Sequence, residues 1–448
     1  MVISTIKKSQ FYFIFSFMLL VVIGALLLKL PIMFKEDIHG TLSWIDAFFT
    51  ATSAVCVNGL AILPLSHFSF PGQILIMLLI QIGGIGIMTM SASIIFFLGK
   101  SVGWSTNKLI SNITESRTQN SMENMLKEIT IYTVIVEMIG TVFLFTGFLI
   151  DGFNIYESLW NSLFYSISAF CNAGFSPLNT NLVGVSVIIK LSVALLALLG
   201  GIGMYAVHDV KEAFKSMKKN NKHYTLSRAF RSMPLTSKLI LLVSFLLVLI
   251  GMFVIKFSQY DASTPISYID AFFQSAIART AGFNVVDMNT LASGSVAISI
   301  ALMLIGGAPG STSGGMKVTT FALICLTFYA TITGKSKILC FKREIPISNI
   351  LKAFTIATIF ICMAFIGGAI FQAETGETLQ RSLFEMSSAL GGTGLSLGAT
   401  ASNTFNSKIL VIIYMFLGRI GPLTLFLFLL EKEKQSHLKY LEEKVIIG

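Results

Sequence analysis

Apolar stretches long enough to cross a bilayer recur along the whole chain, and short polar or charged segments separate them. A spanning helix needs about 20 mostly apolar residues. The first stretch, residues 11–28, is long and is followed by no small-residue cleavage site, so it predicts a membrane span rather than a signal peptide. Seven more spans are expected at residues 71–98, 128–150, 182–207, 237–256, 295 onward, 351–371 and 407–430.

Inside each pair of spans lies a segment that is too short and too polar near its end to cross a bilayer. Each begins as an apolar helix and closes on a glycine; the segments are residues 44–64, 160–177, 268–287 and 383–399. The closing glycines, Gly59, Gly174, Gly282 and Gly394, are 115, 108 and 112 residues apart. Near-equal spacing of one unusual signature indicates an internal repeat. The repeat is imperfect, because ten residues separate the glycine from Phe49, Phe164 and Phe384, but nine separate it from Phe273.

This pattern predicts an all-α membrane protein made of four tandem units, each a span, a re-entrant pore loop and a span. The units are residues 1–98, 99–207, 208–334 and 335–430, followed by a tail at 431–448. Lysine and arginine are concentrated between the units rather than within them, which predicts that both termini and the inter-unit loops are cytoplasmic. Units of equal orientation imply pseudo-fourfold symmetry around one central pore.

The composition agrees with a membrane protein and argues against nucleic-acid binding, metal binding and catalysis. The chain is 54% hydrophobic and 12% charged with a mean hydropathy of +0.79, whereas soluble domains carry about 25% charged residues. Its net charge of +10 belongs to the loops between spans and does not indicate nucleic-acid binding. The five cysteines and five histidines form no metal-binding pattern. We find no nucleophile or carboxylate pair for a membrane enzyme, so we expect neither catalysis nor a cofactor in this chain.

The re-entrant loops are the expected site of function. Non-helical backbone at membrane depth is tolerated only where it is buried in protein or lines a water-filled path. Four bends on one axis would form rings of carbonyls, which replace the hydration shell of a cation, and glycine permits this backbone geometry. The alternative is that the glycines only pack helices. The predicted filter residues are Val57, Asn58, Gly59, Asn172, Ala173, Gly174, Thr280, Ala281, Gly282, Gly392, Thr393 and Gly394.

A second informative stretch, residues 306–317, interrupts an apolar segment with glycine, serine, threonine and proline. Broken membrane segments of this kind point to a permeation path; the alternative is a helix kink at Pro309. The expected gating residues are Gly310, Ser311, Thr312, Ser313, Gly314, Gly315 and Lys317. The stretch also approaches a phosphate-binding loop, but the lysine spacing is wrong and no strand precedes it.

Arg419 and Glu137 are charged residues deep inside predicted spans. Arg419 lies in the last span. A charged side chain inside a membrane span has a high free-energy cost, so it suggests a functional role. The alternative is an arginine that snorkels to the interface. Glu137 is the second such charge, and the sequence assigns it no partner.

The four loops resemble a known family. The sequences that carry the resemblance are VCVNGL from Val55, AFCNAGF from Ala169, ARTAGFN from Ala278 and LGGTGLS from Leu390. They look like the filter loops of the Trk/Ktr/HKT potassium transporters, and over essentially the whole chain the similarity is greatest to the bacterial Ktr membrane subunit. In that family, glycine in all four loops goes with potassium and serine in the first loop with sodium. Gly59 therefore implies K+ as the transported ion, with Na+ coupling left open.

The resemblance also implies a mechanism and partners. Residues 306–317 would be an intramembrane gate below the filter, and Arg419 would face the pore and limit flow. A homodimer in the bacterial cell membrane, in contact with lipids, is implied, with the tail either in the dimer contact or frayed. A separate cytosolic ring-forming subunit would bind the nucleotide and dock on the basic loops. The competing predictions are a sodium-conducting or Na+-coupled member of the family, and an alternating-access carrier, for which inverted repeats would be expected.

Overall fold

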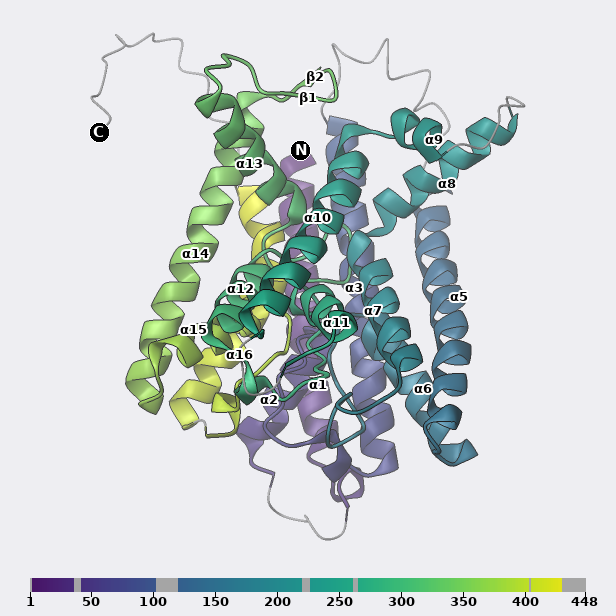
Figure 1. Ribbon diagram of the computed structural model, residues 1–448, viewed down its shortest axis with the longest axis vertical. Helices are drawn as coiled ribbons and strands as arrows, with labels where there is room; N and C mark the ends of the chain where they lie inside the picture. Colours follow the sequence, from purple (N-terminus) through teal and green to yellow (C-terminus); the bar gives the residue numbers. More distant parts are fainter. Residues whose placement is uncertain are drawn as a thin grey trace.

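The structure is a computed structural model that describes residues 2–35, 42–101, 120–219, 226–260, 265–402 and 404–428 (Figure 1). The α-helices in chain order are α1 (Val2–Leu28), α2 (Trp44–Val55), α3 (Phe70–Ser101), α5 (Asn120–Ile150), α6 (Ile155–Phe170), α7 (Val187–Ile202), α8 (Met204–Lys219), α9 (Leu226–Ser232), α10 (Leu235–Ser258), α11 (Tyr268–Ala278), α12 (Ser293–Leu304), α13 (Val318–Ile332), α14 (Ile347–Thr375), α15 (Leu379–Gly391) and α16 (Phe405–Phe428). Short 3-10 turns lie at Pro31–Met33, Leu65–His67, Met288–Thr290 and Ala399–Ser402. One antiparallel hairpin joins β1 (Leu339–Cys340) to β2 (Arg343–Glu344).

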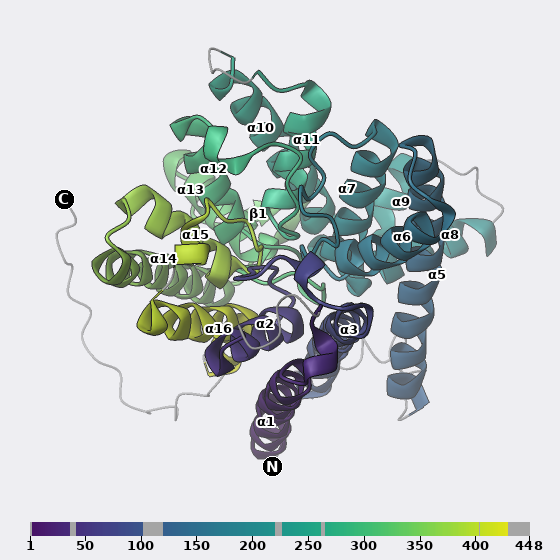
Figure 2. The same cartoon turned by 90° about the horizontal axis from the view of Figure 1, so that it is seen from below.

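Groups of helices follow one another around a common centre in sequence order, as Figure 2 shows. The first group, α1 to α3, packs through α3 against α6 of the second group, and α7 packs against α11 of the third. Helix α12 then packs against α15 of the fourth group, and α16 returns to contact α2 of the first. The chain therefore closes a circle of four groups, with the short helices α2, α6, α11 and α15 inside it.

The outer helices present apolar side chains away from this centre. Phe143 on α5, Phe245 on α10 and Phe365 on α14 are each about 60% exposed, at 58%, 61% and 58%. Four described helical stretches are long and apolar enough to cross a membrane, namely Phe70–Thr89, Lys127–Ile150, Leu235–Ser258 and Ile347–Thr375. A continuous apolar exterior on such helices is the surface that lipid requires, so the chain is a multi-pass helical membrane protein.

Two predicted spans are interrupted: the break at 182–207 corrects the prediction of a continuous span, whereas the sequence predicted the break at residues 306–317. The span expected at 182–207 is two helices, α7 and α8, which meet at 90°. Gly203 lies at the break with a φ of 80°, a positive value that favours glycine, and it ends α7. The span expected from residue 295 stops at the end of α12 and resumes as α13. The predicted tail, and the end of the last predicted span, lie outside the described residues.

The short inner helices are anchored by aromatic side chains. In each, the phenylalanine at the matching position is at most 1% exposed: Phe49, Phe164, Phe273 and Phe384. These are the residues from which the sequence spacing to the glycines was measured. Because full burial of such a side chain stabilises the fold by roughly 1.5–3 kcal/mol, these phenylalanines fix each short helix in the protein interior.

Candidate functional site

The four predicted glycines contact one another in cyclic order. Each has a positive φ: 100° at Gly59, 71° at Gly174, 65° at Gly282 and 82° at Gly394. A Cβ atom added to each would nearly overlap a backbone carbonyl oxygen of the next loop: Gly59 with Ala173 (2.3 Å), Gly174 with Ala281 (2.6 Å), Gly282 with Thr393 (2.0 Å) and Gly394 with Asn58 (2.3 Å). We call this closed arrangement the glycine ring.

Both the conformation and the space at the glycine ring exclude a side chain. A positive φ is unfavourable for residues with a Cβ atom, and a contact under 3.0 Å with backbone cannot be relieved by a rotamer change. The carbonyls that approach the glycines belong to the residue before each glycine, Asn58, Ala173, Ala281 and Thr393. The interior of the four loops therefore consists of backbone, in close contact from loop to loop.

Three of the loops leave their helices in one way. The residue two before the glycine is left-handed in each, with φ of 53° at Val57, 62° at Asn172 and 66° at Gly392. The N–H of the following residue returns to the helix: Asn58 donates to Ser53 O (2.8 Å), Ala173 to Ser168 O (2.7 Å) and Thr393 to Ser388 O (3.1 Å). This is the hydrogen bonding of a helix end that closes on a left-handed residue.

The third loop differs. Thr280 is not left-handed, and Ala281 N–H donates to Ile277 O (2.9 Å), one residue closer in sequence than in the other loops. The shorter spacing from Phe273 to Gly282 thus corresponds to a helix end without the extra left-handed residue. The irregularity in the sequence repeat has a local structural cause.

Two asparagines connect neighbouring parts of the site. Asn58 Nδ2 donates to the carbonyl of Ala389 (2.9 Å) near the end of α15, so it joins the first loop to the fourth. Asn172 Nδ2 donates to Thr312 Oγ1 (2.6 Å), so it joins the second loop to residues 306–317. The two predicted regions are therefore in direct contact.

Residues 306–317, the intramembrane loop, are almost completely buried and form a closed hairpin rather than a kinked helix. Gly306 N–H donates to Met316 O (2.8 Å), which joins the two ends of the loop. Three backbone hydrogen bonds attach it to the α7–α8 bend: Ala308 N to Gly201 O (2.9 Å), Met204 N to Gly310 O (3.2 Å) and Thr312 N to Gly200 O (3.3 Å). The irregular backbone is thus satisfied by protein, as membrane burial requires.

Arg419 lies in α16 with 5% of its surface exposed, and its Nη1 donates to the carbonyl of Thr312. Its burial is inconsistent with a side chain that snorkels to an interface. Its Nε and Nη2 atoms have no hydrogen-bond partner among the described residues. Lys317 Nζ donates to Ser313 O (2.7 Å) in the same loop. Two cationic side chains therefore bond to backbone carbonyls of the intramembrane loop.

The sequence analysis did not identify one further buried cation at the site, Arg279, which directly precedes Thr280. Its side chain is 3% exposed, and its guanidinium donates to Ser244 O in α10 (3.2 Å) and to Gly306 O (3.4 Å). A charged residue inside a re-entrant segment was the available signal. Arg279 thus connects the third loop to the start of the intramembrane loop.

The structure also assigns a partner to Glu137 and leaves the cysteines unpaired. Gln81 Nε2 donates to the Glu137 carboxylate (2.9 Å), which joins α3 to α5. Among the described residues, the five cysteines form no disulfide, and no group of three histidine, cysteine or acidic side chains could hold a metal ion.

The apolar exterior of the long helices and the buried, glycine-closed loops inside them define a multi-pass helical membrane protein. The chain belongs to the TrkH family of cation transport proteins, whose family model matches residues 6–439. It is therefore an ion transporter and not an enzyme.

Two similar proteins are named Ktr system potassium uptake protein B. The one from Bacillus subtilis is 34% identical over 97% of this chain and 95% of its own length. The one from Vibrio alginolyticus is 32% identical over 97% and 93%. The potassium/sodium uptake protein NtpJ of Enterococcus hirae is 31% identical over 97% and 96%. The crystal structure of the potassium transporter TrkH from Vibrio parahaemolyticus has the same fold, with a TM-score of 0.70, 18% identity and coverage of 95% of this chain and 85% of that one.

Proposed function

We propose that the chain carries K+ across the bacterial cell membrane through the glycine ring, as the pore subunit of a Ktr-type uptake system. The observation that carries the proposal is the cyclic contact of Gly59, Gly174, Gly282 and Gly394, which brings four sets of backbone carbonyls together. Carbonyl oxygens can replace the water around a cation. The printed names of the Ktr relatives refer to potassium uptake, in agreement with this function.

The proposed architecture has four units with pseudo-fourfold symmetry, divided at residues 98, 207 and 334 as the sequence predicts. Support comes from the four short helices that end on the glycine ring and from the order of helix contacts around it. Each short helix directs the negative end of its dipole toward the centre, which favours cations.

The proposed gate is the intramembrane loop together with Arg419. Its residues Gly310 to Gly315 lie buried beside the second and fourth pore loops, and a Cβ atom on Gly314 would lie 2.8 Å from Gly391 O. Arg419 and Lys317 add positive charge on this loop, which opposes the passage of a cation. In this arrangement, transport requires the loop and Arg419 to move apart.

The proposed cytoplasmic face is the end that carries α8, α9 and the β hairpin, shown together in Figure 1. Exposed basic residues there include Lys211, Lys215, Lys337 and Arg343. We propose that a cytosolic nucleotide-binding subunit docks on this face and that the chain forms a homodimer. The name "Ktr system" agrees with a multi-subunit assembly. Both termini would be cytoplasmic.

A sodium-conducting or Na+-coupled transporter is the second candidate, because one relative is named a potassium/sodium uptake protein. Gly59 in the first loop favours potassium. An alternating-access carrier is less well supported, since the four short helices contribute to one ring rather than to two inverted halves.

The test is growth of a potassium-uptake-deficient bacterium on low K+, with and without a co-expressed cytosolic Ktr subunit. Wild type is compared with Gly59→Ser and with Gly184→Ser as the matched control, since Gly184 also has a positive φ of 82° but has open space around it. We expect rescue by wild type and Gly184→Ser, and weakened or sodium-shifted rescue by Gly59→Ser. Absence of rescue by the wild type in both conditions, with insertion verified, would contradict the proposal.

A further inference from the structure

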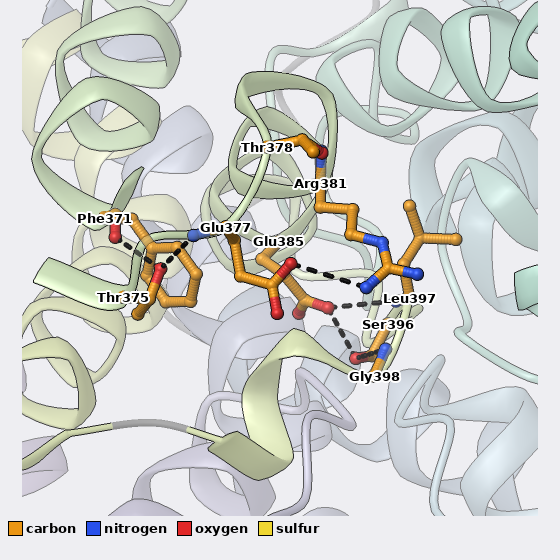
Figure 3. Close-up of polar contacts among 9 residues, drawn as sticks. All are labelled: Phe371, Thr375, Glu377, Thr378, Arg381, Glu385, Ser396, Leu397 and Gly398. Atoms are coloured by element: carbon orange, nitrogen blue, oxygen red, sulfur yellow. Dashed lines mark hydrogen bonds and ion pairs between the residues drawn. The ribbon is translucent and has the colours of Figure 1, made fainter. Parts of the chain in front are cut away.

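Glu385 is a fully buried carboxylate directly behind the fourth loop. It lies in α15 next to Phe384 and has no exposed surface. Its Oε1 accepts hydrogen bonds from Ser396 Oγ (2.5 Å) and Leu397 N–H (2.9 Å), and its Oε2 accepts one from Thr400 Oγ1 (2.6 Å). Figure 3 shows this carboxylate pointing at the chain that leaves the pore loop. One side chain thus holds residues 396–400 against their own helix.

This contact lies close enough to Gly394 to affect its position in the glycine ring. Ser396 follows Gly394 by only two residues, and the Cβ position of Gly282 lies 3.0 Å from the Cα atom of Gly394. A shift of the outer segment would therefore move Gly394 against its neighbour. Both carboxyl oxygens of Glu385 accept hydrogen bonds from this segment, so the side chain is suited to resist such a shift.

An equivalent contact occurs in the second loop. Tyr165 directly follows Phe164, as Glu385 follows Phe384, and it is fully buried. Its hydroxyl is hydrogen-bonded to Ser176 Oγ (2.5 Å) and donates to Asn181 O (3.3 Å). Ser176 comes eleven residues after Tyr165, and Ser396 comes eleven after Glu385. The second and fourth loops are not neighbours in the glycine ring, so two opposite loops share this support.

The first and third loops are also held at the start of their helices. Asp46 at the start of α2 receives a hydrogen bond from Ser43 and an ion pair from Lys408 of α16 (2.6 Å). Asp270 at the start of α11 receives the same pair of contacts from Ser267 and Lys190 of α7 (2.7 Å). The third loop has a contact beyond its glycine as well: Gln274, which directly follows Phe273, donates from Nε2 to Met288 Sδ (3.4 Å).

We propose that Glu385 is a positioning residue for ion selection: through Ser396, Leu397 and Thr400 it fixes the outer segment of the fourth loop, and thereby the carbonyls beside Gly394. Tyr165 has the same role in the second loop. The inference rests on the proposed function, because it concerns discrimination between ions that pass through the glycine ring. A filter that discriminates between K+ and Na+ must hold its carbonyl oxygens in place. Buried hydrogen bonds to the segment beside those carbonyls supply this rigidity.

The experiment compares K+ and Na+ flux into proteoliposomes that contain the full chain. The cytosolic subunit is included if the wild-type protein needs it to conduct, and it is left out otherwise. The variants are Glu385→Gln, Ser396→Ala and Tyr165→Phe. In Glu385→Gln the charge is lost, but one oxygen still accepts and the Thr400 hydroxyl can rotate to accept from the amide. The matched control is Glu377→Gln, which removes a carboxylate of the same region that pairs with the exposed Arg381.

We expect the ratio of K+ to Na+ flux to fall about tenfold in Glu385→Gln, which alters the contacts of a side chain with several hydrogen bonds, and about threefold in Ser396→Ala and Tyr165→Phe, which each lose one hydroxyl. Glu377→Gln should retain the wild-type ratio. The melting temperature in detergent is measured in parallel, because a merely structural residue would lower it and leave the ratio unchanged.

A wild-type flux ratio in folded Glu385→Gln overturns the inference and leaves the potassium function intact. If Glu385→Gln does not fold, Ser396→Ala and Thr400→Val decide, since each removes one hydroxyl that donates to Glu385, although Ser396→Ala also removes the acceptor of Gly398 N–H. A lower ratio in both variants supports the inference, and an unchanged ratio overturns it. A wild-type protein without K+ flux in either condition contradicts the proposed function, and the inference with it.

Discussion

The guanidinium of Arg419 donates a hydrogen bond to the backbone carbonyl of Thr312, although the two residues are 107 positions apart in the chain. The Thr312 side chain donates in turn to the carbonyl of Phe170 (3.1 Å), the last residue of α6. Helix α16, the intramembrane loop and the second pore helix therefore meet at one threonine. In the proposed function, this junction holds the gate closed.

Removal of the charge at this junction should increase transport. We expect Arg419→Gln to raise K+ flux from loaded proteoliposomes about tenfold. Loss of a nearby unit charge should lower the barrier to K+ by roughly 1.4 kcal/mol, which corresponds to this factor. Arg381→Gln is the control, since it removes the same charge from an exposed ion pair. An unchanged or lower flux in correctly folded Arg419→Gln would show that the arginine does not restrict the path.

The Thr312 hydroxyl should contribute to the same restraint. Thr312→Val keeps the shape and the carbonyl bound by Arg419, but loses the hydrogen bonds with Asn172 and Phe170. We expect about a threefold increase in K+ flux, consistent with the loss of one or two buried hydrogen bonds. In the double variant with Arg419→Gln, the two effects should be less than additive because both residues act on one loop. Fully additive effects on K+ flux would show that the two residues act independently.

The glycine ring should reject even a methyl group. Gly282→Ala places a Cβ atom 2.0 Å from Thr393 O at a φ of 65°, so we expect K+ flux to fall by at least about 100-fold. Gly184→Ala has a comparable φ of 82° but open surroundings, and it should cost only about 1 kcal/mol of stability. Equal fluxes in the two variants would argue against close packing at the ring.

The ion pair between Lys408 and Asp46 should support the fold. Both side chains are largely buried, with 16% and 12% exposure, and they connect α16 to α2. We expect Lys408→Met to lower the free energy of unfolding by about 2 kcal/mol, between the values typical of exposed and buried pairs. Lys337→Met breaks an exposed pair with Glu344 and should have almost no effect. Thermal unfolding in detergent measures both, and a double variant with Asp46→Asn should recover part of the loss.

The repeated organisation could be recognised from the sequence because it depends on local patterns. Apolar length, the four phenylalanine-to-glycine segments and the glycine-rich interruption at 306–317 are each visible within a short window. The position of Arg419 in an apolar stretch was equally visible. The bend at Gly203 was not predicted, because glycine is also common within straight membrane helices.

The sequence alone therefore determined that this is a helical membrane protein with four glycine-closed segments, since hydropathy and backbone conformation are properties of the local chain. Only the tertiary structure decided which glycine meets which carbonyl, that Arg419 bonds to Thr312, and that Glu385 holds the segment beyond Gly394. It also paired Lys408 with Asp46 across 362 positions. Such contacts join distant segments, and they depend on how the helices close around a common centre rather than on any periodicity along the chain.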